Sequence, residues 1–194
     1  MKTFQLAGQL RADMGKKATK AVRAAGLIPA IIYGGEKEIT FSVKKEDVRN
    51  LIYTPDIYAV ELNIEGQTYT AIVQDIQFQP VTDEILHIDF LQVFPDKAIT
   101  IEVPVKLEGL ADGVKQGGKL SLEIRKLRVK ALYTNVPERL VIDVTNLGLG
   151  KTIQVGQLAF DNLELLNAKN AVVCAVKLTR AARGAKAAAV AAKK

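Results

Sequence analysis

The sequence predicts a mainly β protein with short helices, arranged as two domains followed by a basic tail. Three observations support this prediction. Short runs of alternating apolar and polar residues recur along most of the chain, a period of two that is typical of half-buried strands. Helical spacing of apolar residues occurs only in two short stretches near the start. Pro and Gly interrupt the runs at intervals that suit turns between strands.

The composition is that of a folded protein without a membrane span. The 194 residues are 48% hydrophobic and 25% charged, and they suffice for one large or two small domains. No apolar run approaches the roughly 18 residues that a span requires. Gln5, Gly8 and Arg11 interrupt the region where a signal peptide would need an apolar core. We therefore expect a cytoplasmic protein with no membrane partner.

Positive charge is concentrated at the two ends of the chain. Residues 1–25 hold six Lys or Arg against one acid, and residues 177–194 hold six against none. The middle of the chain carries a net charge of −5, against +6 for the whole. This asymmetry predicts a polyanionic partner that touches particular surfaces. Charge alone leaves DNA, RNA and anionic lipid open.

The first 35 residues predict a strand, a cationic helix and a second strand. Residues 3–10 alternate as a strand, and the stretch after Gly15 has helical spacing up to Gly26, which suits a helix end. Three alanines and Val22 share one side of the helix, and we expect this side to pack closely on a sheet. The opposite side carries three cations, namely Lys16, Lys20 and Arg23.

Further strands and one more helix complete the predicted first domain. The stretch 44–53 predicts a short helix with Val48, Leu51 and Ile52 as its apolar stripe, and Glu65-Gly66 marks the turn of a hairpin. The last strand of the domain alternates cleanly. Its apolar face has Leu86, Ile88 and Phe90, and its other face has His87 and Asp89.

A joint at Phe94–Asp96 separates a first domain, 1–94, from a second domain, 95–178. The second domain reads as purely β, with no helix expected between Pro95 and Lys177 and with residues 119–133 as one β run. Residues 179–194 are rich in Ala and Lys, and we expect them to form a disordered basic tail.

Candidates for enzymatic or metal chemistry are weak. His87 and Asp89 would need a nucleophile or a second acid, and the sequence offers none. Cys174 lies in an apolar run and is predicted to be a buried strand residue. Gly150-Lys151-Thr152 lacks the earlier glycine and the following helix of a phosphate-binding loop. One His and one Cys cannot form a zinc site, so we expect no metal, no cofactor and no enzyme activity.

Several blocks, in their order and spacing, resemble one bacterial family. Arg11 with residues 15–35, then VQDIQFQP and LHIDF, are similar to large-subunit ribosomal protein L-twenty-five, whose two-domain members are also called general stress protein Ctc. The blocks ADGVKQGGKL and VPERLVIDVTNLGLGKTIQV resemble the second domain of those longer members. The resemblance covers residues 1–178.

This resemblance implies a fold, a partner and a set of contact residues. It implies that the first domain is a six-stranded β-barrel with short helices that binds 5S rRNA within the large ribosomal subunit, beside neighbouring ribosomal proteins. The second domain is absent from some members, so it is not expected to be required for RNA contact. The residues implied to face RNA are Arg11, Lys16, Lys17, Lys20, Arg23, Tyr33, Gln74, His87 and Asp89.

The function expected is therefore that of a structural constituent of the large ribosomal subunit. Two other classes stay open. One is a stress-induced, RNA-associated regulator or chaperone, which would remain mostly off the large subunit during sedimentation. The other is a tRNA-binding module, since small β-barrels also serve as anticodon-binding domains.

Overall fold

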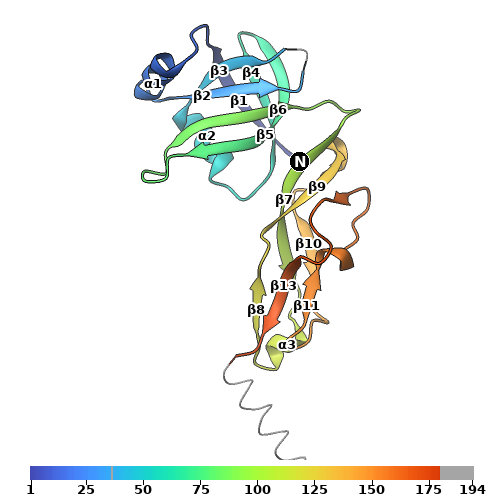
Figure 1. Ribbon diagram of the computed structural model, residues 1–194. Helices are drawn as coiled ribbons and strands as arrows, with labels where there is room; N and C mark the ends of the chain where they lie inside the picture. The colour runs from blue at the N-terminus through green and yellow to red at the C-terminus, as the bar shows by residue number, and fades with distance from the viewer. Residues whose placement is uncertain (36, 180–194) are drawn as a thin grey trace, which may run out of the picture. The chain divides into compact units, whose positions relative to one another are not determined.

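The computed structural model describes residues 1–35 and 37–179 and divides them into two compact units (Figure 1). The first unit is Met1–Ile99 together with Leu132–Glu138, and the second is Thr100–Ala131 together with the chain from Arg139 on. The mainly β class is confirmed, with a closed six-stranded barrel in the first unit and smaller sheets in the second. The joint expected at residues 94–96 stays a prediction.

The barrel closes through two parallel and four antiparallel strand pairs. Its order is β1-β3-β2-β6-β5-β4, with β4 returning to β1. The parallel pairs are β1 with β4 and β2 with β6, and all other neighbours run antiparallel. The strands are β1 (Lys2–Leu10), β2 (Leu27–Tyr33), β3 (Ile39–Lys44), β4 (Tyr58–Ile64), β5 (Gln67–Phe78) and β6 (Ile85–Gln92).

Alternation along these strands fills the barrel with apolar side chains. Phe41 on β3 and Phe90 on β6 are fully buried, and their ring centroids lie 5.7 Å apart. The predicted hairpin is present between β4 and β5, where Glu65 and Gly66 both have positive φ, as a tight two-residue turn requires.

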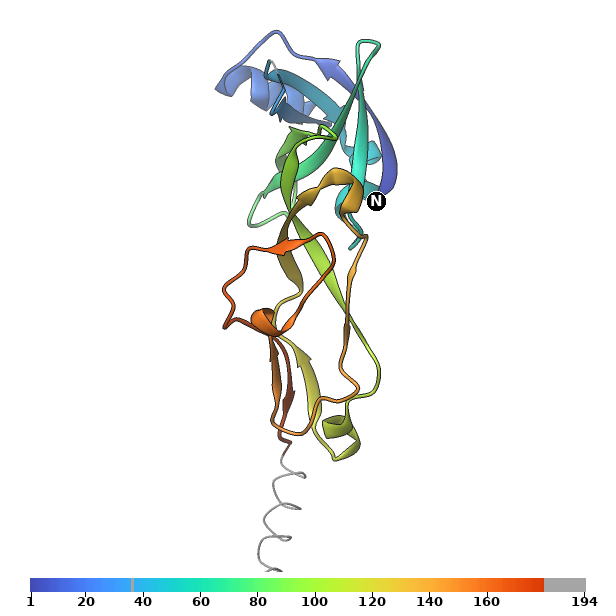
Figure 2. The ribbon, with the colours of Figure 1, turned by 90° about the vertical axis from the view of Figure 1, so that its right-hand side faces the viewer.

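Both predicted helices are present on the outside of the barrel. They are α1 (Lys16–Ala24) and α2 (Lys45–Ile52). Gly26 has a φ of 76° just after α1, as expected for the residue that ends it. Val48 and Leu51 of α2 are buried in the core, and Figures 1 and 2 show α1 beside β2.

The expectation that the alanine side of α1 packs closely on the sheet is wrong. No residue of α1 is buried, and only Ala18, Thr19 and Val22 are half-buried. Ala21 and Ala25 are exposed. Helical spacing alone shows which side faces the protein but not how much of that side finds a surface to cover. The helix therefore lies on the rim of the barrel, with most of its circumference in solvent.

The second unit contains two small sheets. One has the order β10-β7-β9-β12 and the other the order β11-β13-β8. Val103, Val129 and Val173 are among its fully buried residues. The strands are β7 (Ala98–Glu108), β8 (Lys119–Leu122), β9 (Lys126–Leu132), β10 (Leu140–Asp143), β11 (Thr152–Gln154), β12 (Glu164–Leu165) and β13 (Val172–Lys177).

Two expectations for the second domain are wrong. A helix, α3 (Asp112–Lys115), and two 3-10 turns, η1 (Tyr133–Asn135) and η2 (Val155–Gln157), occur where no helix was expected. Elements of three or four residues are too short to show helical spacing in the sequence. The run 119–133 is divided into β8 and β9, which belong to different sheets. The tail expected at 179–194 lies outside the described residues, apart from Thr179.

Gly8 of β1 provides a direct test of barrel packing. A Cβ at this position would lie 2.7 Å from Cδ2 of Phe41, which is fully buried and backed by Phe90. We expect Gly8→Ala to lower the free energy of unfolding by about 1–2 kcal/mol, because the ring has little room to move. Urea unfolding followed by circular dichroism measures this change.

The control is Gln9→Ala at the neighbouring exposed position of β1, which should change stability by less than about 0.5 kcal/mol. Equal stability of Gly8→Ala and the unmodified protein would contradict the packing described here.

Candidate nucleic-acid interface

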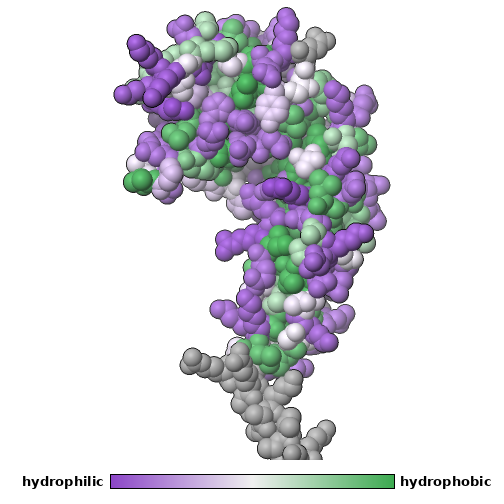
Figure 3. Space-filling view, viewed as in Figure 1, coloured by the Kyte–Doolittle hydropathy of each residue, from purple (hydrophilic) through white to green (hydrophobic). Residues whose placement is uncertain are grey.

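Three lysines of α1 form a row of exposed cations without acidic neighbours. We call Lys16, Lys17 and Lys20 the α1 lysines. Among the described residues none of them has an ion pair or a side-chain hydrogen bond, and all are exposed. Figure 3 shows hydrophilic side chains gathered over this helix at the upper left. The α1 lysines are free to neutralise an anionic partner.

The position of the α1 lysines within the helix is electrostatically unfavourable in the free protein. Lys16 and Lys17 lie in the first turn, where the helix dipole is positive, and this turn contains no acidic residue. The preceding Gly15 has a φ of 104° and offers no side-chain cap, so the first backbone N–H groups also lack that partner. A phosphate at this end would interact favourably with the lysines and with the dipole together.

Arg23 differs from the α1 lysines because its guanidinium is bound to the barrel. Its Nε and Nη2 donate to the backbone carbonyl of Leu86, at 3.1 and 2.9 Å. That carbonyl lies at a β-bulge between β5 and β6. Gln77 pairs with His87 and Phe78 pairs with Ile85, so Leu86 is the extra residue on β6. Arg23 therefore anchors α1 beside β6, a role that the helical spacing did not predict.

Arg11 is fixed where β1 ends and the chain turns toward α1. Its backbone N–H donates to the carbonyl of Thr40 at 3.0 Å, and the Thr40 hydroxyl donates to the Arg11 carbonyl at 3.3 Å. The guanidinium Nη2 donates to the carbonyl of Asp13 at 3.2 Å. Arg11 is thus held at the end of β1, beside Thr40 of β3.

The outward faces of β5 and β6 bring further predicted residues together. Strand pairing places Asp75 opposite Asp89 and Gln77 opposite His87. His87 Nδ1 and Asp89 Oδ1 lie 2.6 Å apart, and the two side chains are 27% and 30% exposed. A hydrogen bond of this kind orients the imidazole and leaves its other nitrogen available to a partner.

Tyr33 ends β2, which runs parallel to β6 on the other side of that strand. Burial, and then the charges of Asp89 and Asp75, raise the pKa of the Tyr33 phenol above its ordinary value. The hydroxyl therefore stays protonated and can donate a hydrogen bond. Tyr33, Asp75, His87 and Asp89 form what we call the outer face of the barrel.

Gln74 occupies a second irregular position in the same ladder. Val73 pairs with Phe90 and Asp75 with Asp89, so Gln74 is the extra residue on β5 and its side chain is exposed. Bulges of this kind redirect a side chain and increase the local twist. The side chain of Gln74 is therefore set by the bulge and not by simple alternation along the strand.

Sequence reasoning missed two features of this site. Asp75 was not singled out, although the register of β5 against β6 makes it the direct neighbour of Asp89. The available signal was the position of Asp75 in VQDIQF, two residues before Gln77 and therefore on the same face of the strand. The carbonyl of Leu86 was also missed, and no sequence signal points to a backbone acceptor exposed by a bulge.

The other residues that the sequence raised as candidates can be placed in the described part of the chain. The described residues contain no cluster of three or more His, Cys, Asp or Glu side chains placed to hold a metal ion. Cys174 is buried, as predicted, and burial raises the pKa of its thiol, which disfavours the nucleophilic thiolate. Thr152 begins β11, so the Gly150-Lys151-Thr152 stretch leads into a strand, as expected. No helix in residues 1–35 and 37–179 is long and apolar enough to cross a membrane.

The arrangement as a whole suits a structured polyanion. Lysines available for phosphates lie on α1, and the outer face presents a phenol, an imidazole and carboxylates beside them. RNA helices are recognised through phosphates, 2′-hydroxyls and base edges in a shallow groove, and these groups need such a mixture of donors and acceptors.

Comparison with known proteins assigns the chain to a family. Residues 6–90 match the model of the Ribosomal L25p family, and residues 98–180 match the model described as the C-terminal domain of ribosomal protein TL5. A relative in Porphyromonas gingivalis, named large ribosomal subunit protein bL25, is 64% identical over 187 residues, covering 95% of this chain and 97% of its own.

Two further relatives with the same name are similar along their whole length. The Parabacteroides distasonis protein is 63% identical, covering 96% of this chain and 99% of its own. The Bacteroides thetaiotaomicron protein is 54% identical, covering 97% and 99%. All three relatives are named as ribosomal proteins and not as enzymes. With an L25p match in the first unit and such identity over nearly the whole chain, this protein belongs to the Ribosomal L25p family.

Proposed function

We propose that this protein is a structural component of the large ribosomal subunit and binds 5S rRNA through its first unit. The observation that carries the proposal is the row of unpaired α1 lysines beside the outer face of the barrel. The names of the relatives support a place in the large subunit. The choice of 5S rRNA rests on the family resemblance, to which the geometry adds a suitable surface.

The two parts of the surface have different tasks in this proposal. The α1 lysines neutralise phosphates and supply affinity that depends on salt but not on base sequence. The outer face supplies hydrogen bonds to 2′-hydroxyls and base edges, with Tyr33 as a donor and Asp89 as an acceptor. Arg23 holds α1 against β6, so that the phosphate contacts and the groove contacts keep a fixed spacing.

The experiment that tests the proposal is a titration of the full chain against 5S rRNA and against tRNA at two salt concentrations. Selective binding of 5S rRNA supports the proposed function, and equal or stronger binding of tRNA supports a tRNA-binding module. Residues 1–94 measured alone show whether the second domain contributes to the contact. A chain that binds neither RNA selectively and stays off the large subunit in gradients of moderate salt supports the regulator or chaperone class.

The α1 lysines should determine much of the salt dependence. We expect the triple variant Lys16→Ala, Lys17→Ala, Lys20→Ala to depend less on salt. The negative slope of log affinity against log salt should become shallower by about 2. Each lost phosphate contact removes roughly 0.7–0.9 from the slope, because fewer counterions are released on binding. Filter binding to 5S rRNA over a salt series measures the change.

The matched control removes three lysines from the second unit, at Lys119, Lys126 and Lys130, all of which are exposed. The net charge falls equally in the two triple variants, so a general charge effect predicts equal slopes. Equal slopes would remove α1 from the proposed interface.

The variant Asp89→Asn tests the outer face, because simple charge repulsion and a specific contact predict opposite changes in affinity for RNA. Removal of a negative charge beside a polyanion should raise affinity by Coulomb's law alone. If Asp89 orients His87 and accepts hydrogen bonds from RNA, affinity should instead fall, by about tenfold for a hydrogen bond to a charged group. The measurement is the dissociation constant for 5S rRNA at constant salt.

Glu61→Gln on β4 is the control for this test, since it removes the same charge from a strand that does not pair with β6. Its affinity should stay unchanged or rise slightly. An Asp89→Asn variant that behaves like Glu61→Gln would mean that the outer face makes no specific contact.

A further inference from the structure

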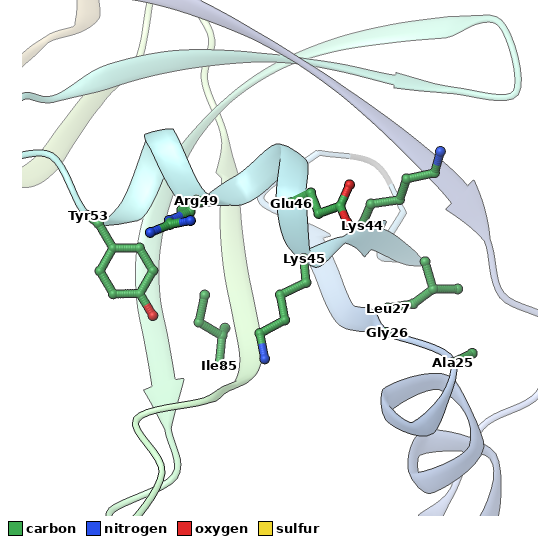
Figure 4. A pocket seen from close by; sticks show the side chains of 9 residues that line it. All are labelled: Ala25, Gly26, Leu27, Lys44, Lys45, Glu46, Arg49, Tyr53 and Ile85. Carbon is green, nitrogen blue, oxygen red and sulfur yellow. The ribbon is translucent and has the colours of Figure 1, made fainter.

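A groove of about 850 Å³ lies beside α2 and reaches the end of α1 (Figure 4). Its lining comes from the start of β2 and the two residues before it, from the last residue of β3, from α2 with Tyr53 after it, and from the first residue of β6. The backbone N–H of Lys45 donates to the carbonyl of Gly26 at 3.3 Å and joins two of these segments. None of the residues predicted to face RNA lines the groove.

The groove has apolar walls and an exposed aromatic rim. Ile85 and Leu27 contribute buried and half-buried surface, and Tyr53 at the end of α2 is 60% exposed. The Tyr53 hydroxyl lies 3.5 Å from the carbonyl of Asp83, in the turn between β5 and β6. Beside that turn Phe78 is 42% exposed, and within it Val81 is 88% exposed. Exposed apolar groups gathered in this way mark surfaces that a partner covers.

The charges around the groove differ from those of α1. Lys45 is paired with Glu84 at 2.8 Å, and Asp83 lies next to Glu84 in the turn. Arg49 has no ion pair or side-chain hydrogen bond within the described part of the chain. In Figure 4 the Arg49 side chain lies beside Tyr53. Lys44 and Glu46 also line the groove, and neither has an ion pair or a side-chain hydrogen bond among the described residues. The unpaired charges of the groove are therefore mixed, and Arg49 is the one that lies beside Tyr53.

This pattern favours a protein over RNA as the occupant. Among the residues that line the groove, the Lys45 charge is already offset by Glu84, so the groove offers no row of unpaired lysines like that of α1 for successive phosphates. Protein interfaces instead combine an apolar centre with a polar rim, and they draw much of their binding energy from Tyr and Arg. Charge complementarity requires one carboxylate for Arg49 and one large apolar side chain for the space between Tyr53 and Ile85.

We propose that this groove is the docking site for a segment of a neighbouring protein in the large subunit, in which an Asp or Glu lies next to a large apolar residue. The apolar side chain packs against Tyr53, Leu27 and Ile85, and the carboxylate binds Arg49. The inference rests on the proposed place of the protein in the large subunit, but not on its contact with 5S rRNA.

The test is photocrosslinking of the full chain within purified large subunits. Val81 is replaced by the photoreactive p-benzoylphenylalanine, the subunits are irradiated, and the crosslinked product is mapped by mass spectrometry. We expect a crosslink to a protein segment of the stated chemistry. Arg49→Glu, made in the same chain, should lower the crosslink yield at least fivefold because it opposes a carboxylate with a like charge.

Lys37→Glu is the matched control, because it makes the same charge change at an exposed residue of the first unit that does not line the groove. Its yield should stay within twofold of the unmodified chain. Equal losses in both variants would overturn the proposal, as would a crosslink to rRNA or a yield no higher than that from the same probe at exposed Gln67.

Sedimentation separates failure of this inference from failure of the proposed function. A chain absent from the large-subunit fraction contradicts the proposed function, and the docking site with it. A chain that sediments with the subunit and gives no protein crosslink at Val81 contradicts only the docking site.

Discussion

The parallel pairing of β2 with β6 is the contact on which the candidate interface depends. It aligns Ala30–Tyr33 with Ile88–Leu91, and it completes the ring of strands between β3 and β5. Because side chains alternate along each strand, this single register turns Ile32 and Phe90 inward while it sets Asp89 outward. A shift by one residue would expose the aromatic core and bury a carboxylate, so the fold and the site are specified by the same constraint.

The two bulges in the β5–β6 ladder link the pairing of β2 with β6 to the position of helix α1. The extra residue at Leu86 places a carbonyl where Arg23 can bind it with two donors, and the extra residue at Gln74 changes the alternation beside Asp75. An α1 helix without a buried residue gains little from hydrophobic burial, so this hydrogen-bonded pair is its main specific attachment to β6. Arg23 thereby helps to fix the position of the α1 lysines, and its own contact with RNA stays a prediction.

Sequence patterns predicted the elements well where a period extends over many residues. Alternation or a short apolar run marked the strands of the barrel, and glycines marked the end of α1 and the β4–β5 turn. The clean alternation expected for β6 is wrong at Leu86, because the bulge makes Ile85 and not Leu86 the buried residue there. Barrel closure came only from the family resemblance, because strand partners that are distant in sequence leave no local signal. Bulges depend on one extra residue in a pair of strands, and helix α3 has only four residues, so both escape any reading of periodicity.

The same limit applies to the surfaces. The α1 lysines are neighbours in sequence and could be predicted as a group, whereas Asp75 meets Asp89 only through strand pairing. The groove beside α2 combines Leu27, Arg49, Tyr53 and Ile85 from three separate segments, and no stretch of sequence suggests it. Its mixed charges and apolar walls contrast with the unpaired lysines of α1, and this contrast is a physical reason to assign the two surfaces to partners of different chemistry. A protein fixed between RNA and another protein needs such a separation, because a phosphate backbone and an apolar segment cannot satisfy the same surface.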